Sequence, residues 1–392
     1  LMGLINIVAD ENILLLDEFF GGLAKITKVD GRTISAEQVA QADALVLRST
    51  AKITPAMLSH SQVQFVGTCT IGTDHLAKDY MDANNIVWRN APGCNAAGVG
   101  DYVIACLNHA WQTLGIDPRE VTIGIVGAGN VGGRLAQRLR AAGFNLLICD
   151  PPQACAGQKG LVTLDELLAQ SQIICLHTPL TKQGRHATEN LINAQRVTDL
   201  AKGTLLISAG RGEVIDQQAV LERQQQHNDL HLYMDVWHQE PNIDIQLFGY
   251  SHCVTPHVAG HSLEGKMRGT HMIYQALCQH FDLHVSETLD SLMPAPKRAQ
   301  LAISSNATAK QTMQQACNGV YPLMEDDARM RGMQNGHDFD GLRKTYPVRR
   351  EFSSLQLRGI ADAEISNMMA GLGFGVAVDT NTIKTQGPVN EL

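Results

Sequence analysis

The chain has 392 residues, which predicts two or three domains at about 150 residues per domain. Hydrophobic residues make up 44% of the sequence and charged residues 18%, a balance that excludes a long disordered chain. Lysine and arginine number 31 against 39 aspartates and glutamates, so the formal net charge is −8 and nucleic-acid binding is not expected as the main role.

Membrane insertion and disulfide bonding are not expected either. No stretch approaches the roughly 18 unbroken apolar residues that would cross a bilayer. No basic segment precedes a long apolar run near the start of the sequence, so we expect no secretory signal. The nine cysteines are scattered and none forms a Cys-x-x-Cys pair, which is typical of reduced cysteines in a cytoplasmic protein.

The first hundred residues alternate strand-like and helix-like segments. Short apolar runs bounded by polar or glycine-containing loops predict buried parallel strands over residues 4–8, 44–47 and 64–67. This pattern predicts a small α/β unit, and ligands of such a unit would sit at the ends of its strands.

A longer alternation begins near Val121. Strands are predicted over residues 121–126, 146–149, 173–177, 204–208, 232–236 and 253–255. Helices are predicted over residues 131–142, 164–169, 188–197 and 217–226. Strand and helix in strict alternation predict a parallel sheet with helices on both faces. Pro294 and Pro296 mark the start of a third region, which is polar at first and then basic.

A glycine-rich turn links the first strand of this alternation to its first helix, and it fits G-x-G-x-x-G. The first glycine permits a tight turn, the second lets the backbone approach a pyrophosphate, and the third lets the helix pack on the strand. The N-terminus of the following helix would offer N–H groups to the phosphates. The predicted dinucleotide-binding residues of this turn are Gly127, Gly129, Asn130, Val131 and Gly132.

An acidic residue follows the next strand, where a dinucleotide site would need one. Asp150 lies 23 residues after Gly127, and a carboxylate there would bind the adenosine ribose and repel a 2′-phosphate. No arginine follows closely, so NAD is favoured over NADP. The alternative is a glycine-rich turn in a nucleotide-free sheet, beside a merely solvated aspartate.

Three further motifs lie at the ends of later predicted strands. They contain Arg211 between two glycines, Glu240 before a proline, and His257 after Thr-Pro. Together with the glycine motif, they resemble the D-2-hydroxyacid dehydrogenase family. The resemblance implies two Rossmann-like doubly wound domains, one for substrate and one for NAD, plus a C-terminal α+β dimerisation domain. The implied boundaries are 2–100 with 260–288 for the substrate domain, 101–259 for the NAD-binding domain and 289–392 for the C-terminal domain.

A narrower set of motifs resembles one branch of that family, and it includes the C-terminal region that other members lack. These motifs occupy residues 65–68, 72–75, 91–96, 263–266, 292–296 and 349–355. The resemblance implies oxidation of 4-phospho-D-erythronate to (R)-3-hydroxy-2-oxo-4-phosphooxybutanoate, a step of pyridoxine 5′-phosphate (vitamin B6) biosynthesis. It also implies a homodimer, and the cysteine pattern favours the cytoplasm.

The three strand-end residues suit the chemistry of a 2-hydroxy acid. His257 is the candidate base for the hydroxyl proton in oxidation and the acid in the reverse direction. Glu240 would bind the other ring nitrogen and select the tautomer. Arg211 would bind carboxylate and carbonyl oxygens with its planar fork. The alternatives are a surface ion pair for Arg211, a solvated loop carboxylate for Glu240, and a merely structural polar residue for His257.

The resemblance assigns further residues to the site. It implies substrate contacts for Ser49, Thr70 and His261, although the family commonly has a tyrosine at the position of His261. It implies contacts on the nicotinamide side of NAD for Thr178, Ala209, Gly210, Asp235 and Gly260.

No metal is expected, because the chain has no His-Glu-x-x-His arrangement at His257 and His261 and hydride transfer needs none. A substrate phosphate would need cations, and the alternative for any charge cluster is a solvated face. The candidate cations are Lys266, Arg268, Arg343, Lys344, Arg349 and Arg350.

Two other functions remain open from the sequence. One is a related dehydrogenase, such as one for 3-phosphoglycerate, against which the C-terminal motifs argue. The other is an NADH-sensing binding module, against which the complete set of Arg211, Glu240 and His257 argues.

Overall fold

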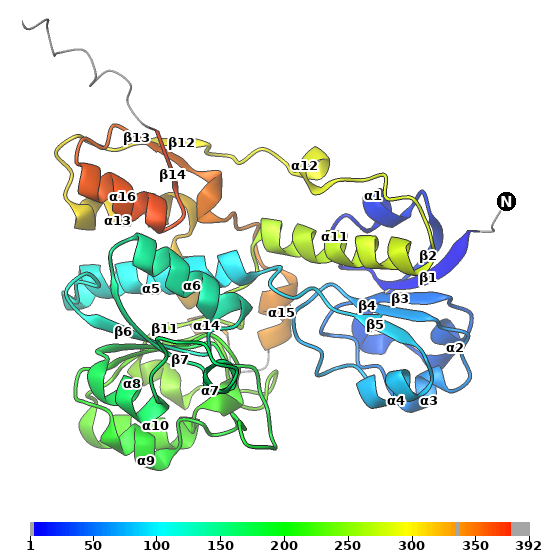
Figure 1. Cartoon of the computed structure of the whole chain (residues 1–392), viewed down its shortest axis with the longest axis horizontal. Helices are drawn as coiled ribbons and strands as arrows, with labels where there is room; N and C mark the ends of the chain where they lie inside the picture. The colour runs from blue at the N-terminus through cyan, green and yellow to red at the C-terminus, as the bar shows by residue number, and fades with distance from the viewer. Residues whose placement is uncertain (1–3, 334–337, 378–392) are drawn as a thin grey trace, which may run out of the picture. The chain divides into compact units, whose positions relative to one another are not determined.

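The computed structural model describes residues 4–333 and 338–377. The chain divides into two compact units, Leu1–Gly98 with Gly260–Pro294, and Val99–Ala259 with Ala295–Leu392 (Figure 1). Parts of the predicted domain ranges, namely residues 2–3, 334–337 and 378–392, lie outside the described residues.

The first unit contains a five-stranded parallel sheet in the order β2-β1-β3-β4-β5. Its strands are β1 (Ile5–Asp10), β2 (Ala24–Val29), β3 (Ala44–Leu47), β4 (Phe65–Thr68) and β5 (Val87–Arg89). The three strands predicted in this region are confirmed to within two residues. Strands β2 and β5 were not predicted, because edge strand β2 has a largely exposed surface and β5 has only three residues.

Helices cover both faces of this sheet (Figure 1). They are α1 (Leu16–Phe20), α2 (Ala36–Ala40), α3 (Pro55–Leu58), α4 (Lys78–Ala83), α11 (Leu263–His280) and α12 (Leu289–Leu292), with a short 3-10 helix at Gly31–Thr33. The long helix α11 returns from much later in the sequence, and its Ile273, Tyr274 and Leu277 pack in one core with Phe19 and Phe65.

The second unit contains a six-stranded parallel sheet in the order β11-β10-β9-β8-β6-β7. Its strands are β6 (Thr122–Val126), β7 (Asn145–Cys149), β8 (Ile173–Leu176), β9 (Leu205–Ser208), β10 (His231–Met234) and β11 (Ser251–Val254). All six predicted strands are confirmed to within two residues. Because β6 lies between β7 and β8, the strand order reverses at β6, and doubly wound sheets bind their ligands at such a point.

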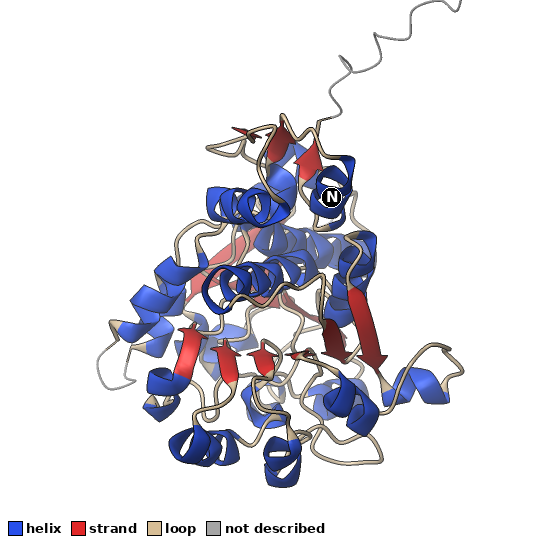
Figure 2. Cartoon of the chain, turned by 90° about the vertical axis from the view of Figure 1, so that its left-hand side faces the viewer, coloured by secondary structure: helices blue, strands red, loops and turns tan. Residues whose placement is uncertain are grey.

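Alternating side chains explain why these strands are apolar throughout. In β9, Leu205 and Ile207 belong to one core, and Leu206 between them belongs to the core on the opposite face. Helices lie on both faces of the sheet (Figures 1 and 2). They are α5 (Ala96–Leu114), α6 (Asn130–Ala141), α7 (Pro151–Cys155), α8 (Leu164–Gln170), α9 (Ala194–Asp199) and α10 (Gln217–His227), with 3-10 helices at Gly212–Val214 and Gln246–Tyr250.

One helix differs from its predicted range, and helices α5 and α7 were not predicted. The predicted helix over 188–197 is wrong in its first half, because Ile192 forms a β-bridge with Ile215 and Asn193 caps a helix that begins only at Ala194. Helix α5 was not predicted. It is buried along most of its length, so it lacks the polar face that makes a helix recognisable by periodicity.

The C-terminal segment has α+β structure, as predicted. A three-stranded parallel sheet consists of β12 (Gln300–Ala302), β13 (Gln356–Arg358) and β14 (Gly375–Val376). The helices are α13 (Ala309–Val320), α14 (Leu323–Arg331), α15 (Phe339–Lys344) and α16 (Ala363–Gly371), with a 3-10 helix at Phe352–Ser354. Among the described residues, none of the helices combines the length and the apolar character needed to cross a bilayer.

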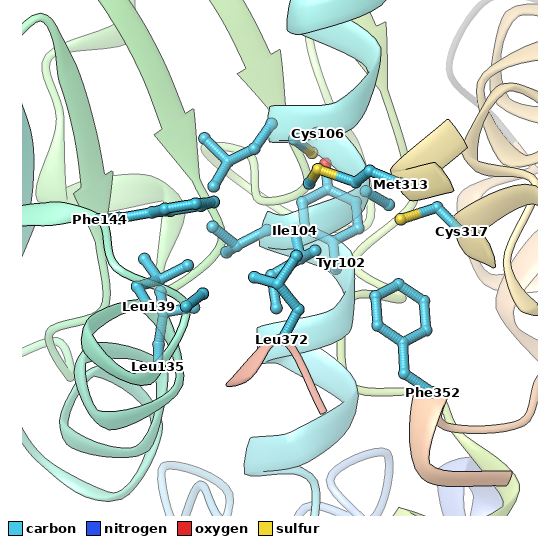
Figure 3. Close-up of a cluster of buried hydrophobic side chains, with 14 of the residues drawn as sticks. Tyr102, Ile104, Cys106, Leu135, Leu139, Phe144, Met313, Cys317, Phe352 and Leu372 are labelled. Atoms are coloured by element: carbon cyan, nitrogen blue, oxygen red, sulfur yellow. The ribbon is translucent and has the colours of Figure 1, made fainter. Parts of the chain in front are cut away.

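One hydrophobic core joins the C-terminal segment to the six-stranded sheet. Figure 3 shows side chains of α5 and α6 meeting side chains of the C-terminal segment in this core. Met313 and Leu372 are fully buried there together with Leu139 of α6. This apolar contact explains why the C-terminal segment and the six-stranded sheet form a single compact unit.

A buried ion pair lies at the edge of the same core. Arg138 of α6 donates to Asp101 of α5 at 2.6 Å and also to the backbone carbonyl of Leu372. The second oxygen of Asp101 accepts the backbone N–H of Phe352 at 2.9 Å. Each of the two charged side chains therefore forms hydrogen bonds both to a helix of the sheet and to the C-terminal segment.

The shared core predicts that a C-terminal substitution destabilises the whole unit. Leu372→Ala should lower the free energy of unfolding by about 2–5 kcal/mol, because it leaves a cavity among fully buried side chains. Leu4→Ala is the control, since Leu4 is 64% exposed. Urea denaturation measures both, and equal free energies for the two variants would contradict the shared core.

Candidate functional site

The glycine turn after β6 has three glycines with different surroundings. Gly127 has φ of 89°, a left-handed conformation that favours glycine. A Cβ at Gly132 would overlap the carbonyl oxygen of Gly127, so helix α6 could not pack this closely with any other residue there. A Cβ at Gly129 would meet nothing within 4 Å, so the protein itself does not require this glycine. The open space beside Gly129 fits the close approach of a pyrophosphate.

Asp150 lies beside this turn. It follows β7 and caps the N-terminus of α7 by accepting the backbone N–H of Gln153 at 3.0 Å. Its other carboxylate oxygen accepts the backbone N–H of Ala128 at 2.8 Å. The side-chain amide of Gln153 also links the two segments. It donates to the carboxylate of Asp150 at 3.1 Å and to the carbonyl of Ala128 at 2.8 Å. The acid is therefore held against the glycine turn, where the ribose of a dinucleotide would lie.

The loop after β8 meets the glycine turn from the other side of the switch point. A Cβ at Gly127 would lie 3.0 Å from the carbonyl oxygen of His177, and one at Gly210 would lie 3.1 Å from that of Thr178. The hydroxyl of Thr178 is buried and has no hydrogen-bond partner among the described residues. A buried hydroxyl without a partner costs free energy, and a bound polar ligand would supply one. The residues around this hydroxyl therefore fit a bound NAD, and this observation does not depend on the glycine motif.

The loops after β9 and β10 approach each other at Gly212. A Cβ on Gly212 would overlap the backbone carbonyl of Trp237, so glycine is required where the loops cross. Gly212 follows Arg211, whose guanidinium donates to the carbonyl of Gly210 at 2.9 Å. This crossing brings the backbone that follows Arg211 next to the turn of residues 237–240, which carries Glu240.

Glu240 and His257 form the hydrogen-bonded pair that the sequence predicted. His257 Nδ1 lies 2.7 Å from Glu240 Oε2, and Glu240 Oε1 accepts the backbone N–H of Trp237 at 2.9 Å. Burial by itself would raise the pKa of Glu240, but the nearby His257, the N–H of Trp237 and Arg343 together hold it below its usual value. The carboxylate is therefore ionised and can only accept, so the proton between the two residues belongs to Nδ1. In the neutral form of the ring, the lone pair then lies on Nε2.

Asp235 orders the turn that carries His257. Its side chain is fully buried, and its carboxylate accepts the hydroxyl of Thr255 at 2.6 Å and the backbone N–H groups of Val258 and Ala259 at 2.8 and 3.0 Å. The backbone carbonyl of Asp235 accepts the N–H of His257 at 2.7 Å. The expected contact of Asp235 with a carboxamide would have to be made in addition to these hydrogen bonds.

Two residues that the sequence analysis did not assign to the site also form hydrogen bonds that connect these loops. The indole of Trp237 donates to the carbonyl of Thr255 at 2.9 Å, which links the loops after β10 and β11. The side-chain amide of Gln217 donates to the carbonyl of Val236 at 3.0 Å and accepts the N–H of His238 at 3.1 Å. The tryptophan stands inside the motif around Glu240, but nothing in a linear motif distinguishes a packing residue from a reacting one.

The expected substrate residues and Gly260 belong to the first unit. Ser49 is exposed and Thr70 half-buried, and they follow the neighbouring parallel strands β3 and β4, so they lie at the same edge of the sheet. The hydroxyl of Thr70 lies 2.8 Å from that of Thr68. His261 is half-buried just before α11, and a Cβ at Gly260 would overlap the side-chain amide of Asn95.

The basic candidates differ in their availability to a phosphate. Arg349 is 5% exposed and donates to the carbonyl of Ala259, so its guanidinium is engaged inside the protein. Arg268 donates to the carbonyl of Cys94 at 2.9 Å. Lys344 is exposed at the end of α15. Among the described residues, no three His, Cys, Asp or Glu side chains gather in an arrangement that could hold a metal ion.

His177 predicts a specific acid sensitivity. Burial lowers the pKa of His177 to about 4, and neither ring nitrogen has a hydrogen-bond partner among the described residues. An unfolded histidine titrates near 6.5, so between about pH 6.5 and 4 the unfolded chain binds a proton that the folded chain does not. The free energy of unfolding should therefore fall with decreasing pH in that window.

His177→Leu should reduce this slope by up to about 1.4 kcal/mol per pH unit, measured by urea denaturation across the window. Exposed His227 supplies the control, and His227→Leu should leave the slope unchanged. An unchanged slope in His177→Leu would show that this imidazole is protonated in the folded protein.

Two family models match the chain. One is described as the NAD-binding domain of D-isomer specific 2-hydroxyacid dehydrogenases and matches residues 97–259. The other is described as a domain of unknown function and matches residues 292–373. The second unit therefore combines an NAD-binding domain with a segment whose role the family description leaves unassigned.

Relatives match over nearly the whole length. A protein of Chromohalobacter salexigens named erythronate-4-phosphate dehydrogenase is 44% identical over 386 residues, which cover 96% of this chain and 100% of that protein. One of the same name from Pseudomonas fluorescens Pf0-1 is 44% identical over 374 residues, covering 94% of this chain and 98% of that protein.

Solved structures share the fold. NAD-bound 3-phosphoglycerate dehydrogenase of Entamoeba histolytica has a TM-score of 0.62 at 21% identity, covering 71% of this chain and 96% of that one. D-lactate dehydrogenase of Aquifex aeolicus, with NAD and lactic acid, has a TM-score of 0.58 at 21% identity, covering 71% and 96%. The expected pair of doubly wound domains is thereby confirmed.

Proposed function

The chain belongs to the erythronate-4-phosphate dehydrogenase family, and on that premise we propose that it oxidises 4-phospho-D-erythronate to (R)-3-hydroxy-2-oxo-4-phosphooxybutanoate in pyridoxine 5′-phosphate (vitamin B6) biosynthesis. It is an NAD-dependent oxidoreductase acting on a CH–OH group. The observation that carries the proposal is the 2.7 Å pair of His257 and Glu240 at the carboxyl end of a parallel sheet.

His257 acts as the base. Because Nδ1 donates to Glu240, Nε2 is the ring nitrogen that accepts the proton of the substrate's C2 hydroxyl. Glu240 fixes this tautomer and stabilises the imidazolium that forms, and its lowered pKa keeps it ionised throughout. In the reverse direction, the same imidazolium returns the proton to the carbonyl oxygen.

Arg211 holds the acid end of the substrate. A guanidinium stays charged at any working pH and binds two carboxylate oxygens at once. The crossing at Gly212 supports this part, because it sets the loop of Arg211 against the turn of Glu240. The carboxylate bound there would present C2 and its hydroxyl to His257.

NAD supplies the acceptor for the hydride that leaves C2. The residues proposed to hold its adenosine and phosphate half are Gly127, Gly129, Asn130, Val131, Gly132 and Asp150. Those proposed for the nicotinamide half are Thr178, Ala209, Gly210, Asp235 and Gly260. The open space at Gly129 and the hydroxyl of Thr178, which has no partner within residues 4–333 and 338–377, support this assignment.

The substrate residues and the assembly are proposed on the family resemblance. Ser49, Thr70 and His261 contact substrate from a domain of residues 2–100 and 260–288, and residues 101–259 form the NAD-binding domain. Residues 289–392 form the dimerisation domain of a cytoplasmic homodimer. Sedimentation equilibrium at micromolar concentration tests the assembly, and a monomer would remove that part of the proposal.

The activity is tested with purified protein, NAD and 4-phosphoerythronate, by following the absorbance of the reduced nicotinamide. A 2-oxo acid is supplied as a second acceptor in case the cofactor stays bound through turnover. Turnover with 3-phosphoglycerate in place of 4-phosphoerythronate would indicate a related dehydrogenase. NADH binding without turnover of either would indicate a sensing module and would overturn the proposal.

Replacing the base should abolish most of the rate. His257→Gln removes the group that accepts the hydroxyl proton, so kcat should fall by roughly 10²–10⁴ while NADH still binds. Steady-state kinetics and quenching of NADH fluorescence measure the two effects. His227→Gln, at an exposed position on α10, is the matched control and should retain full activity.

Arg211→Lys should not behave as a conservative change. A lysine keeps the positive charge but cannot make the forked contact, so kcat/KM should fall by at least about tenfold. Arg140→Lys, at an exposed position of α6, controls for the chemical change. Wild-type kcat/KM in Arg211→Lys would show that the side chain acts only as a point charge.

A further inference from the structure

The backbone on both sides of His257 is held by residues of the C-terminal segment. Strand β11 is an edge strand of the six-stranded sheet, so one side of its backbone lacks a neighbouring strand. Helix α14 covers this edge. Asp327 accepts the backbone N–H of Val254, three residues before His257, at 2.8 Å, and Arg331 donates to the carbonyl of Ser251 at 2.8 Å.

A buried arginine holds the other side. Arg349 donates to the backbone carbonyl of Ala259, two residues after His257. Its guanidinium carbon lies 4.3 Å from the ring centroid of Tyr321, and one of its nitrogens lies 3.5 Å from the hydroxyl of Tyr346. With only 5% of its surface exposed, this side chain is part of the protein interior.

The charge of Arg349 is balanced inside the same cluster. Asp326 of α14 accepts the hydroxyl of Tyr321 at 2.8 Å and that of Tyr346 at 2.6 Å. The two phenols therefore connect a buried carboxylate with a buried guanidinium. Buried charges are retained when they are paired and hydrogen-bonded, so the cluster can hold Arg349 firmly against Ala259.

The turn between these two anchors needs such support. His257 has φ of 55°, a left-handed conformation that is uncommon for residues other than glycine and persists where the surroundings impose it. Asp235 holds the N–H groups of Val258 and Ala259 from the sheet side. Arg349 holds the carbonyl of Ala259 from the side of the C-terminal segment.

We propose that Arg349 is a positioning residue for catalysis, which holds the turn of residues 255–259 so that His257 stays hydrogen-bonded to Glu240 and aimed at the substrate. The proposal rests on the function assigned above to His257. It gives the segment matched by the domain of unknown function a part in the reaction: that segment anchors the catalytic turn through Asp327 on one side and Arg349 on the other.

Arg138 offers a matched control. It is also a largely buried arginine, it also donates to a backbone carbonyl, that of Leu372, and it is paired with Asp101 at 2.6 Å. None of these contacts involves residues 254–259. A merely structural arginine should therefore behave like Arg138.

The experiment compares Arg349→Met with Arg138→Met in the full-length protein. Both variants should lower the unfolding temperature. Arg349→Met alone should lower kcat with 4-phosphoerythronate, by roughly 10- to 100-fold, because a small displacement of a catalytic group has that effect. The Kd for NADH should stay within about twofold of wild type in both. Equal kcat in the two variants would overturn the proposal.

Milder variants decide the case in which Arg349→Met does not fold. Arg349→Lys keeps the charge but cannot reach both Ala259 and Tyr346 with a fork, and Tyr346→Phe removes one partner of the guanidinium. In each variant, kcat should fall by a larger factor than the factor by which KM changes. Wild-type kcat in both would overturn the proposal.

A spectroscopic measurement separates this proposal from the function on which it rests. The Nδ1 proton of His257, held by Glu240, should give a distinct resonance in protein with isotope-labelled histidine, identified by its absence in His257→Gln. It should persist in Arg138→Met and broaden or disappear in Arg349→Met, whichever substrate the enzyme uses. A wild-type resonance in Arg349→Met would refute positioning, whereas a lack of turnover in the wild-type protein would refute only the proposed substrate.

Discussion

The hydrogen bond between His257 Nδ1 and Glu240 Oε2 is the interaction on which the site depends. Its 2.7 Å length couples two loops that follow neighbouring strands, β10 and β11. The bond selects the tautomer that leaves Nε2 free to accept a proton. Most of the polar contacts around it hold one of the two loops in place: Asp235 and Arg349 on the side of His257, and the N–H of Trp237 on the side of Glu240.

The C-terminal segment packs on the NAD-binding domain through apolar and polar contacts alike. Met313 and Leu372 complete the core on one face of the six-stranded sheet, and Met330 and Phe339 complete the core on the other. Asp327 covers the backbone of the edge strand β11. A segment with this many buried contacts contributes to the stability of the unit, and it also contacts the strand that leads to His257, the proposed base.

The dinucleotide site combines tightly packed positions with open ones. Gly132 is required by the packing of α6, whereas the space beside Gly129 is open and the hydroxyl of Thr178 has no partner in the part of the chain that the structure describes. The ring nitrogens of His177, next to Thr178, are buried and have no hydrogen-bond partner among the described residues, and the lowered pKa of this histidine makes the same region sensitive to acid. The site is therefore closely packed where helix α6 meets the turn. It has buried polar atoms without hydrogen bonds, among the described residues, where a ligand would supply contacts.

Local patterns in the sequence determined the parallel sheets, the glycine turn, and the candidates Asp150, Arg211, Glu240 and His257. Short apolar runs and glycine spacing act over a few residues, so they can be recognised without the fold. Helix α5 and edge strand β2 lacked such a pattern, because burial and exposure along them follow from their neighbours. Only the tertiary structure decided the part of Arg349. Its partner Ala259 lies 90 residues away in the sequence, and a charge cluster in a sequence carries no sign of whether packing will bury it or leave it in water.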